Sequence, residues 1–94
     1  MKSAYELAME RLAAAAPAVR LNDDQKRRIA EIEAKCRADI AAKELLLGGE
    51  MEKARAAGEA DQIVQLQRQL ADEIRRFEER RDRDKDAIRA EKHP

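Results

Sequence analysis

The side chains that most often carry out covalent or metal chemistry are scarce in this sequence. It holds one cysteine, Cys36, and one histidine, His93, which is the next-to-last residue. A nucleophilic thiol needs a base within hydrogen-bond reach, and zinc sites need several Cys or His ligands at short spacings. Cys36 instead falls on the apolar stripe of its segment, as a small core residue does. We therefore expect no catalytic, cofactor-binding or metal-binding residue and no enzyme activity.

Carboxylates are abundant but follow no pattern that a catalytic or metal site requires. The 94 residues include 20 acidic and 20 basic ones, so the formal net charge is zero although 43% of the chain is charged. The sequence contains no HExxH, no CxxC, no glycine-rich phosphate loop and no Glu-x-x-His pair of the di-iron type. A chain without net charge has no general attraction to nucleic acid or to a membrane surface.

The composition favours long helices with a thin core. Ala, Leu, Glu, Lys and Arg predominate, and the aromatic residues are one Tyr and one Phe. Ordering a chain costs about 1.5 kcal/mol per residue, so a small and thin monomer has little net stability. Oligomerisation is the usual remedy where disulfides and metals are lacking. We expect a homo-oligomer, most simply a dimer.

Three helices are expected within one all-α domain that spans residues 1–94. Pro17 interrupts the first helix, and Asn22 with Gln25 forms an Asn-x-x-Gln capping box at the start of the second. Gly58 favours the left-handed conformation that ends a helix, and Asp61 is suited to cap the third. The expected helices cover about residues 3–16, 23–57 and 61–90.

The pair Gly48-Gly49 resembles a turn, but the apolar pattern passes through it without a change of phase. Ile40, Leu47 and Met51 share one helical face with Ile29. A turn between two helices would generally reset that phase. We therefore expect one continuous helix of about 50 Å.

The two long helices are expected to form an antiparallel hairpin. Their apolar residues recur with an eleven-residue period, which favours a nearly straight, coiled-coil-like pairing. Folding at the break opposes Met51 to Leu70, Leu47 to Ile74 and Ile40 to Arg81. We expect the hairpin seam to consist of Ile40, Leu47, Met51, Leu66, Leu70, Ile74 and Phe77. The first helix is a candidate to cover residues 29–40, and a second chain is the other.

The opposite side of the second helix carries a row of small residues where charged ones would be expected. Alanine alone needs no partner there, since it is the best helix former. Leu45 and the two interior glycines fit that explanation poorly, because each glycine costs about 1 kcal/mol relative to alanine. We interpret this row as a packing face for the first helix or for a second subunit. We call it the small-residue face; its members are Ala38, Ala42, Leu45, Gly49 and Ala56.

The charged segment 75–92 invites comparison with nucleic-acid-binding helices. Its basic and acidic residues alternate, and phosphate binding needs an unopposed basic patch. The pairs Arg75–Glu79, Glu79–Arg83 and Arg80–Asp84 have the i,i+4 spacing that supports a solvated helix. We therefore expect a solvent-exposed helix end and only a weak case for nucleic acid.

No apolar run is long enough to cross a bilayer, so we expect no membrane span. The stretch AAAAPA at 13–18 resembles a cleavage site, but Glu6, Glu10 and Arg11 interrupt the apolar region that a signal peptide requires. We expect a cytoplasmic protein.

Residues 50–74 resemble the UVR motif, a helical hairpin of excision-repair nuclease subunits and of some Clp-associated adaptors. The residues in register with it are Glu50, Met51, Ala54, Leu66 and Leu70, while Ala60 replaces its Phe and Gln67-Arg68 its Arg-Asp. The resemblance implies association with the hairpin of another protein. The whole layout is also similar to that of short bacterial helical proteins, a likeness that implies no activity.

Three hypotheses follow for the function. The first is a non-enzymatic helical hairpin that associates with itself, and the second is a UVR-like adaptor for a different protein in DNA repair or protein quality control. The third is a helix pair weakly associated with nucleic acid.

Overall fold

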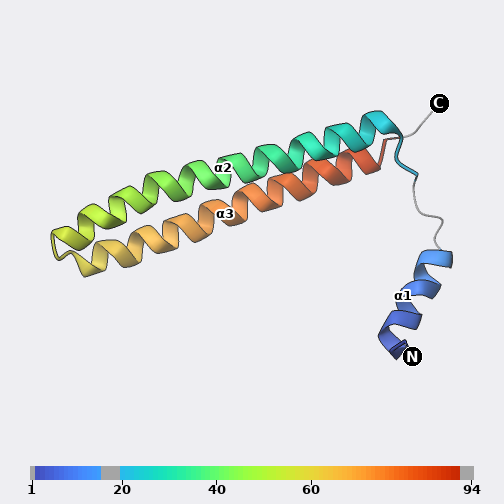
Figure 1. Cartoon of the computed structure of the whole chain (residues 1–94), viewed down its shortest axis with the longest axis horizontal. Helices are drawn as coiled ribbons and strands as arrows, with labels where there is room; N and C mark the ends of the chain where they lie inside the picture. The colour runs from blue at the N-terminus through green and yellow to red at the C-terminus, as the bar shows by residue number, and fades with distance from the viewer. Residues whose placement is uncertain (1, 16–19, 92–94) are drawn as a thin grey trace.

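The computed structural model describes residues 2–15 and 20–91 and consists there of three α-helices (Figure 1). They are α1 (Ala4–Ala15), α2 (Asp23–Ala56) and α3 (Ala60–Arg89). α2 and α3 lie side by side and antiparallel, which confirms the predicted all-α hairpin. Pro17 and His93 lie outside the described residues, as do the side chains of residues 12–15.

α2 is continuous over 34 residues and includes Gly48-Gly49, as the uninterrupted apolar phase predicts. Its first turn carries the predicted capping box. The Asn22 side chain accepts a hydrogen bond from the Gln25 backbone N–H at 2.7 Å, and the Gln25 side chain accepts one from the Asn22 N–H at 3.0 Å. Asp23 and Asp24 lie in the first turn, where negative charge is stabilised by the helix dipole.

The turn between α2 and α3 occupies only residues 57–59. Gly58 has φ of 72°, the left-handed conformation that favours glycine. The Glu59 N–H donates to the Ala54 carbonyl at 2.9 Å and the Gly58 N–H to the Arg55 carbonyl at 3.1 Å, the two bonds of a Schellman motif. The predicted cap at Asp61 is wrong, because α3 begins at Ala60. The N-cap position is Glu59, whose side chain makes no capping hydrogen bond.

The short turn also corrects the predicted register of the hairpin. Cys36 donates a hydrogen bond from its thiol to the Phe77 carbonyl at 3.6 Å and lines a hollow together with Arg81. The predicted register placed Arg81 opposite Ile40, about one helical turn away. The error has a simple cause, since the prediction centred the turn at residues 58–61 and the structure centres it on Gly58.

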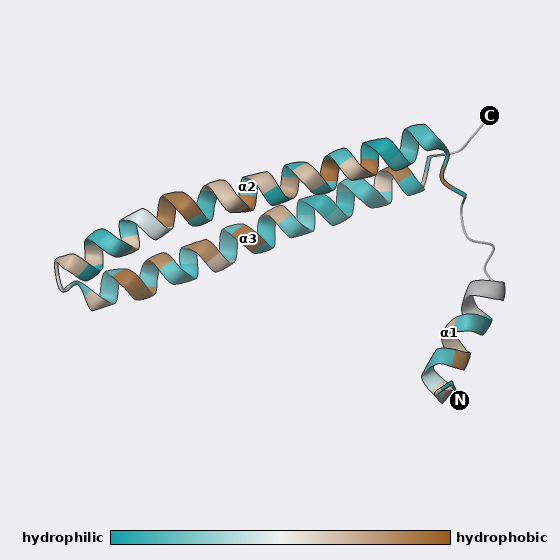
Figure 2. Cartoon of the chain, viewed as in Figure 1, coloured by the Kyte–Doolittle hydropathy of each residue, from teal (hydrophilic) through white to brown (hydrophobic). Residues whose placement is uncertain are grey.

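The seam runs along the whole hairpin but is thin. The buried apolar residues of the described chain are Ile29, Cys36, Leu47, Ala54, Leu66 and Ile88. On α3 the predicted eleven-residue series is buried or half-buried throughout, including Arg81 and Lys85. Figure 2 shows that the C-terminal half of α3 is largely hydrophilic. The narrow core therefore depends on a few side chains.

α1 makes no contact with α2 or α3 among the residues that the structure describes (Figure 1). The expectation that the first helix covers residues 29–40 is therefore not met within the chain. Ile29 and Cys36 are buried all the same, since the C-terminal turns of α3 reach them. Tyr5, Leu7 and Met9 of α1 are exposed.

Candidate protein-interaction surface

The predicted seam residues lie inside the hairpin. Leu47 and Leu66 are buried, with 2% and 4% of their surface exposed. The other five, Ile40, Met51, Leu70, Ile74 and Phe77, are half-buried. Their apolar surface is largely used in holding α2 against α3, so they leave little area for a partner.

The small-residue face lies on the outside of α2. All its members, Ala38, Ala42, Leu45, Gly49 and Ala56, are exposed. Leu45 is the most exposed of the large apolar side chains in the described chain, at 81%. A leucine left this open gains nothing from the fold of the hairpin.

Neither interior glycine of α2 is required by the hairpin. A Cβ atom built on Gly48 or Gly49 would meet no other atom within 4 Å. Close approach of α3 is therefore not the reason for the pair, although each glycine in a helix interior costs about 1 kcal/mol relative to alanine. The absence of a side chain at Gly49 leaves room beside Leu45 on the exposed face.

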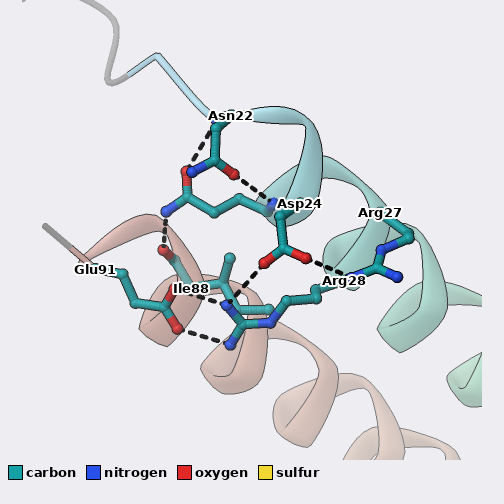
Figure 3. A network of polar contacts seen from close by, with 7 residues as sticks. Asn22, Asp24, Arg27, Arg28, Ile88 and Glu91 are labelled. Atoms are coloured by element: carbon teal, nitrogen blue, oxygen red, sulfur yellow. Dashed lines mark hydrogen bonds and ion pairs between the residues drawn. The ribbon is translucent and has the colours of Figure 1, made fainter. Parts of the chain in front are cut away.

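A polar clasp closes the open end of the hairpin, where α2 begins and α3 ends (Figure 3). Gln25 is 2% exposed, and its side-chain amide donates to the Ile88 carbonyl at 2.9 Å. Arg28 binds both carboxylate oxygens of Glu91 at 2.7 Å, and this contact raises the pKa of Arg28. Sequence reasoning found the capping role of Gln25 but missed its contact with α3. The only signal is a glutamine at a position that a core residue would otherwise occupy.

Ion pairs cross the middle of the seam. Lys85 Nζ lies 2.8 Å from Glu33 Oε1, and Lys43 Nζ lies 3.2 Å from Glu73 Oε2. Both lysines occupy seam positions and extend along the partner helix, so their aliphatic stems add to the apolar contact. The Glu33–Lys85 pair lies beyond the predicted apolar seam and holds α3 against α2 there.

We expect the Glu33–Lys85 pair to make stability fall in acid. The hydrogen bond from Lys85 lowers the pKa of Glu33, so the pair contributes above the unfolded-state value of about 4.3. That contribution is lost as the pH falls through the lower pKa of the folded state. Thermal unfolding followed by circular dichroism should show a smaller acid-induced decrease for Glu33→Gln than for the wild type.

The control for this prediction is Glu44→Gln, which removes an exposed carboxylate that makes no ion pair in the described part of the chain. Glu44→Gln should keep the wild-type pH profile. An identical acid-induced decrease in Glu33→Gln and the wild type would contradict the assignment.

The charges of α3 pair differently from the prediction. The i,i+4 pairs expected at Arg75–Glu79, Glu79–Arg83 and Arg80–Asp84 do not form. Arg75 instead pairs with Asp72, three residues earlier, and Arg89 pairs with Asp86 in the same way. Arg76, Arg80 and Arg83 form no ion pair within the described residues, although Glu79 and Asp84 lie at helical spacing from them.

The described residues offer no arrangement for a metal ion or a membrane span. No group of three His, Cys, Asp or Glu side chains among them is placed to hold a metal. No helix in the same ranges is both long and apolar enough to cross a bilayer.

No protein-family model matches the chain, and comparisons with curated proteins and with solved structures find no match. The resemblance of residues 50–74 to the UVR motif therefore stays a prediction. The structure places that segment at the closed end of the hairpin, around the turn at Gly58. Function must be argued from the surfaces of the hairpin alone.

Proposed function

We propose that the chain is a non-enzymatic interaction module that associates with a second copy of itself through the small-residue face of α2. The observation that carries this proposal is the combination of an open leucine with flanking small residues. Leu45 is 81% exposed, and Gly49 has no neighbour within 4 Å of a Cβ position. Large side chains fit between small ones when two helices pack closely.

The spacing of the exposed face also supports a symmetric pair. With its exposed neighbours Ala34 and Ala41, the small-residue face forms the series Ala34, Ala38, Ala41, Ala42, Leu45 and Gly49, with intervals of 4, 3, 1, 3 and 4 residues that read the same in both directions. In an antiparallel pair centred between Ala41 and Ala42, Leu45 of one chain lies opposite Ala38 of the other. Gly49 lies opposite Ala34 by the same symmetry. A two-fold interface requires this kind of self-complementarity.

The charges at the ends of the face limit its length. Glu31 and Glu52 lie just beyond Ala34 and Gly49, so Ala56 falls outside the symmetric contact, and the two-fold symmetry brings the two carboxylates opposite each other. The repulsion between these two carboxylates opposes a contact that extends beyond them. The contact then covers about 24 Å of each helix, which is small for a stable dimer. We expect micromolar affinity, with Leu45 contributing about 1.5–3 kcal/mol per chain when buried.

The decisive variant is Leu45→Glu. We expect the wild type to be a dimer by size-exclusion chromatography with light scattering at protein concentrations of about 0.1 mM, well above a micromolar Kd. Leu45→Glu should be a monomer, since it places a charge in the centre of the contact. Because Leu45 is exposed, the helix content and the unfolding curve of the separate hairpin should change little.

The neighbouring residue provides the matched control. Leu46 is 56% exposed and points about 100° away from Leu45 around the helix, so Leu46→Glu makes the same chemical change off the small-residue face. It should remain dimeric. A wild type that is monomeric at this concentration, or equal effects of the two variants, would refute the proposed interface.

A second candidate is the UVR-like adaptor, in which the closed end of the hairpin binds a different protein. The observation that supports this candidate is that residues 50–74 form a helical hairpin around Gly58. Of the matching residues, Ala54 and Leu66 are buried between the helices, so a partner would contact exposed neighbours such as Val64. Capture of one stoichiometric partner that Val64→Glu no longer binds would support this candidate.

We also propose a cytoplasmic location. Cys36 is a free thiol buried in the seam. A reducing compartment suits an unpaired cysteine.

A further inference from the structure

We propose that one side of α3 binds an acidic helical segment of another protein through Arg76, Arg80 and Arg83, which we call the arginine flank. The three residues follow one another at intervals of four and three, so they lie along one side of the helix over about 10 Å. They line a shallow hollow of about 340 Å³ together with Lys43, Glu73 and Phe77.

The hollow carries a net positive charge. Glu73 is the single carboxylate among its lining residues, and Lys43 lies 3.2 Å from it. The Glu73 Oε2 atom is buried, and Lys43 is its ion-pair partner within the described structure. The three arginines of the flank are therefore not neutralised by the hollow itself.

Neighbouring acids do not neutralise the arginine flank either. Asp72 pairs with Arg75, and Asp86 pairs with Arg89. No ion pair forms with Arg76, Arg80 or Arg83 anywhere in residues 2–15 and 20–91. The lining of the hollow thus holds four basic residues and one acidic residue, although the whole chain has zero net charge.

The other side of the hairpin has no such excess. The hollow there is lined by Glu33, Arg37, Arg81, Asp82 and Lys85. Lys85 pairs with Glu33 at 2.8 Å, and Arg81 pairs with Asp82 at 3.0 Å, which lowers the pKa of Asp82. The contrast shows that charge compensation is the rule at this seam and that the arginine flank departs from it.

The spacing and surroundings of the flank favour a helix with carboxylates over a phosphate backbone. A helix that carries Glu at i, i+4 and i+7 matches the three guanidinium groups, which bind carboxylates in a bidentate manner. Glu79 and Asp84 lie beside the arginines in the sequence of α3 and are exposed. They would repel a continuous row of phosphates, whereas a partner helix can place its carboxylates opposite the arginines and away from these two acids.

The arginine flank and the small-residue face lie on different helices. The first belongs to α3 and the second to α2. The inference therefore does not rest on self-association, and either surface can be tested while the other remains intact.

The probe is an alanine-based helical peptide with Glu at positions i, i+4 and i+7, labelled for fluorescence anisotropy, with a Gln-substituted peptide as its control. At an ionic strength of about 0.15 M, the full chain should bind the Glu peptide with weak affinity that decreases as salt is added. Arg76→Gln/Arg80→Gln/Arg83→Gln should weaken this binding by about tenfold. Circular dichroism checks that the variant keeps its helix content.

The matched control is Arg68→Gln/Arg75→Gln/Arg89→Gln, which removes the same charge from α3 outside the arginine flank. It should bind the Glu peptide within about threefold of the wild type. Equal losses in both triple variants, or equal binding of the Glu and Gln peptides, would overturn the proposal. A short duplex DNA that binds more tightly than the Glu peptide and is lost with the flank variant would also overturn it, in favour of nucleic acid.

Discussion

Replacing Leu47 with alanine is expected to unfold most of the hairpin at room temperature. Leu47 is 2% exposed in the C-terminal third of α2, in a seam with only a few buried apolar residues. Truncating a buried leucine costs about 2–5 kcal/mol, and small domains are stable by about 5–15 kcal/mol in total. A thin two-helix hairpin belongs at the lower end of that range. In urea unfolding followed by circular dichroism, the urea concentration at the transition midpoint should fall close to zero. The helix content should already be reduced before denaturant is added.

Leu45→Ala is the matched control, because it makes the same chemical change two residues earlier on the opposite side of α2. Leu45 is exposed, so the hairpin itself should lose little stability. Measurements at protein concentrations below the dimer Kd separate folding from association, since dimerisation raises apparent stability by mass action. A Leu47→Ala variant as stable as Leu45→Ala would show that the seam is not the core of the fold.

The architecture could be predicted because it depends on periodicity, which one sequence contains in full. The unbroken phase from Ile40 through Leu47 to Met51 correctly predicted that α2 continues through its two glycines. The Asn22 capping box and the turn at Gly58 could also be predicted, because each depends on residues that are close together in the sequence. Local signals of this kind were sufficient to locate the three helices.

The register was missed because it depends on the length of the turn. Periodicity shows which side of each helix is apolar but not which turns meet. The Schellman motif reverses the chain within residues 57–59, and a turn of that length moves Arg81 from Ile40 to Cys36. A more extended connection would have left the apolar pattern of both helices unchanged.

The arginine flank was missed because sequence spacing permits several pairings of the same charges. Arg75 has Asp72 three residues before it and Glu79 four residues after it, and both are within reach on a helix. The structure selects Asp72. Net charge and spacing do not show which of the possible ion pairs form. They therefore do not show which arginines of α3 remain without an ion-pair partner.

Gln25→Met should open the hairpin locally at its open end while the closed end remains ordered. The Gln25 side chain bonds the Ile88 carbonyl at 2.9 Å and the Asn22 N–H at 3.0 Å, and methionine retains the length of the chain without either bond. The Ile88 carbonyl still accepts from the Glu91 N–H at 3.1 Å and Asn22 is exposed, so the loss is the net contribution of two hydrogen bonds, about 0.5–1.5 kcal/mol each. Hydrogen exchange should therefore become faster for amides near residues 85–91 and change little near residues 60–66.

Gln67→Met distinguishes this clasp from a general effect of losing glutamine. Gln67 is exposed on α3, and its replacement should leave exchange rates unchanged along both helices. The pair of bonds between Arg28 and Glu91 remains in Gln25→Met, so it limits how far the end can separate. If exchange became faster uniformly along the hairpin, folding would be one cooperative unit and the clasp would have no local role. If exchange near residues 85–91 did not change, the buried contact of Gln25 would contribute nothing to holding α3 against α2.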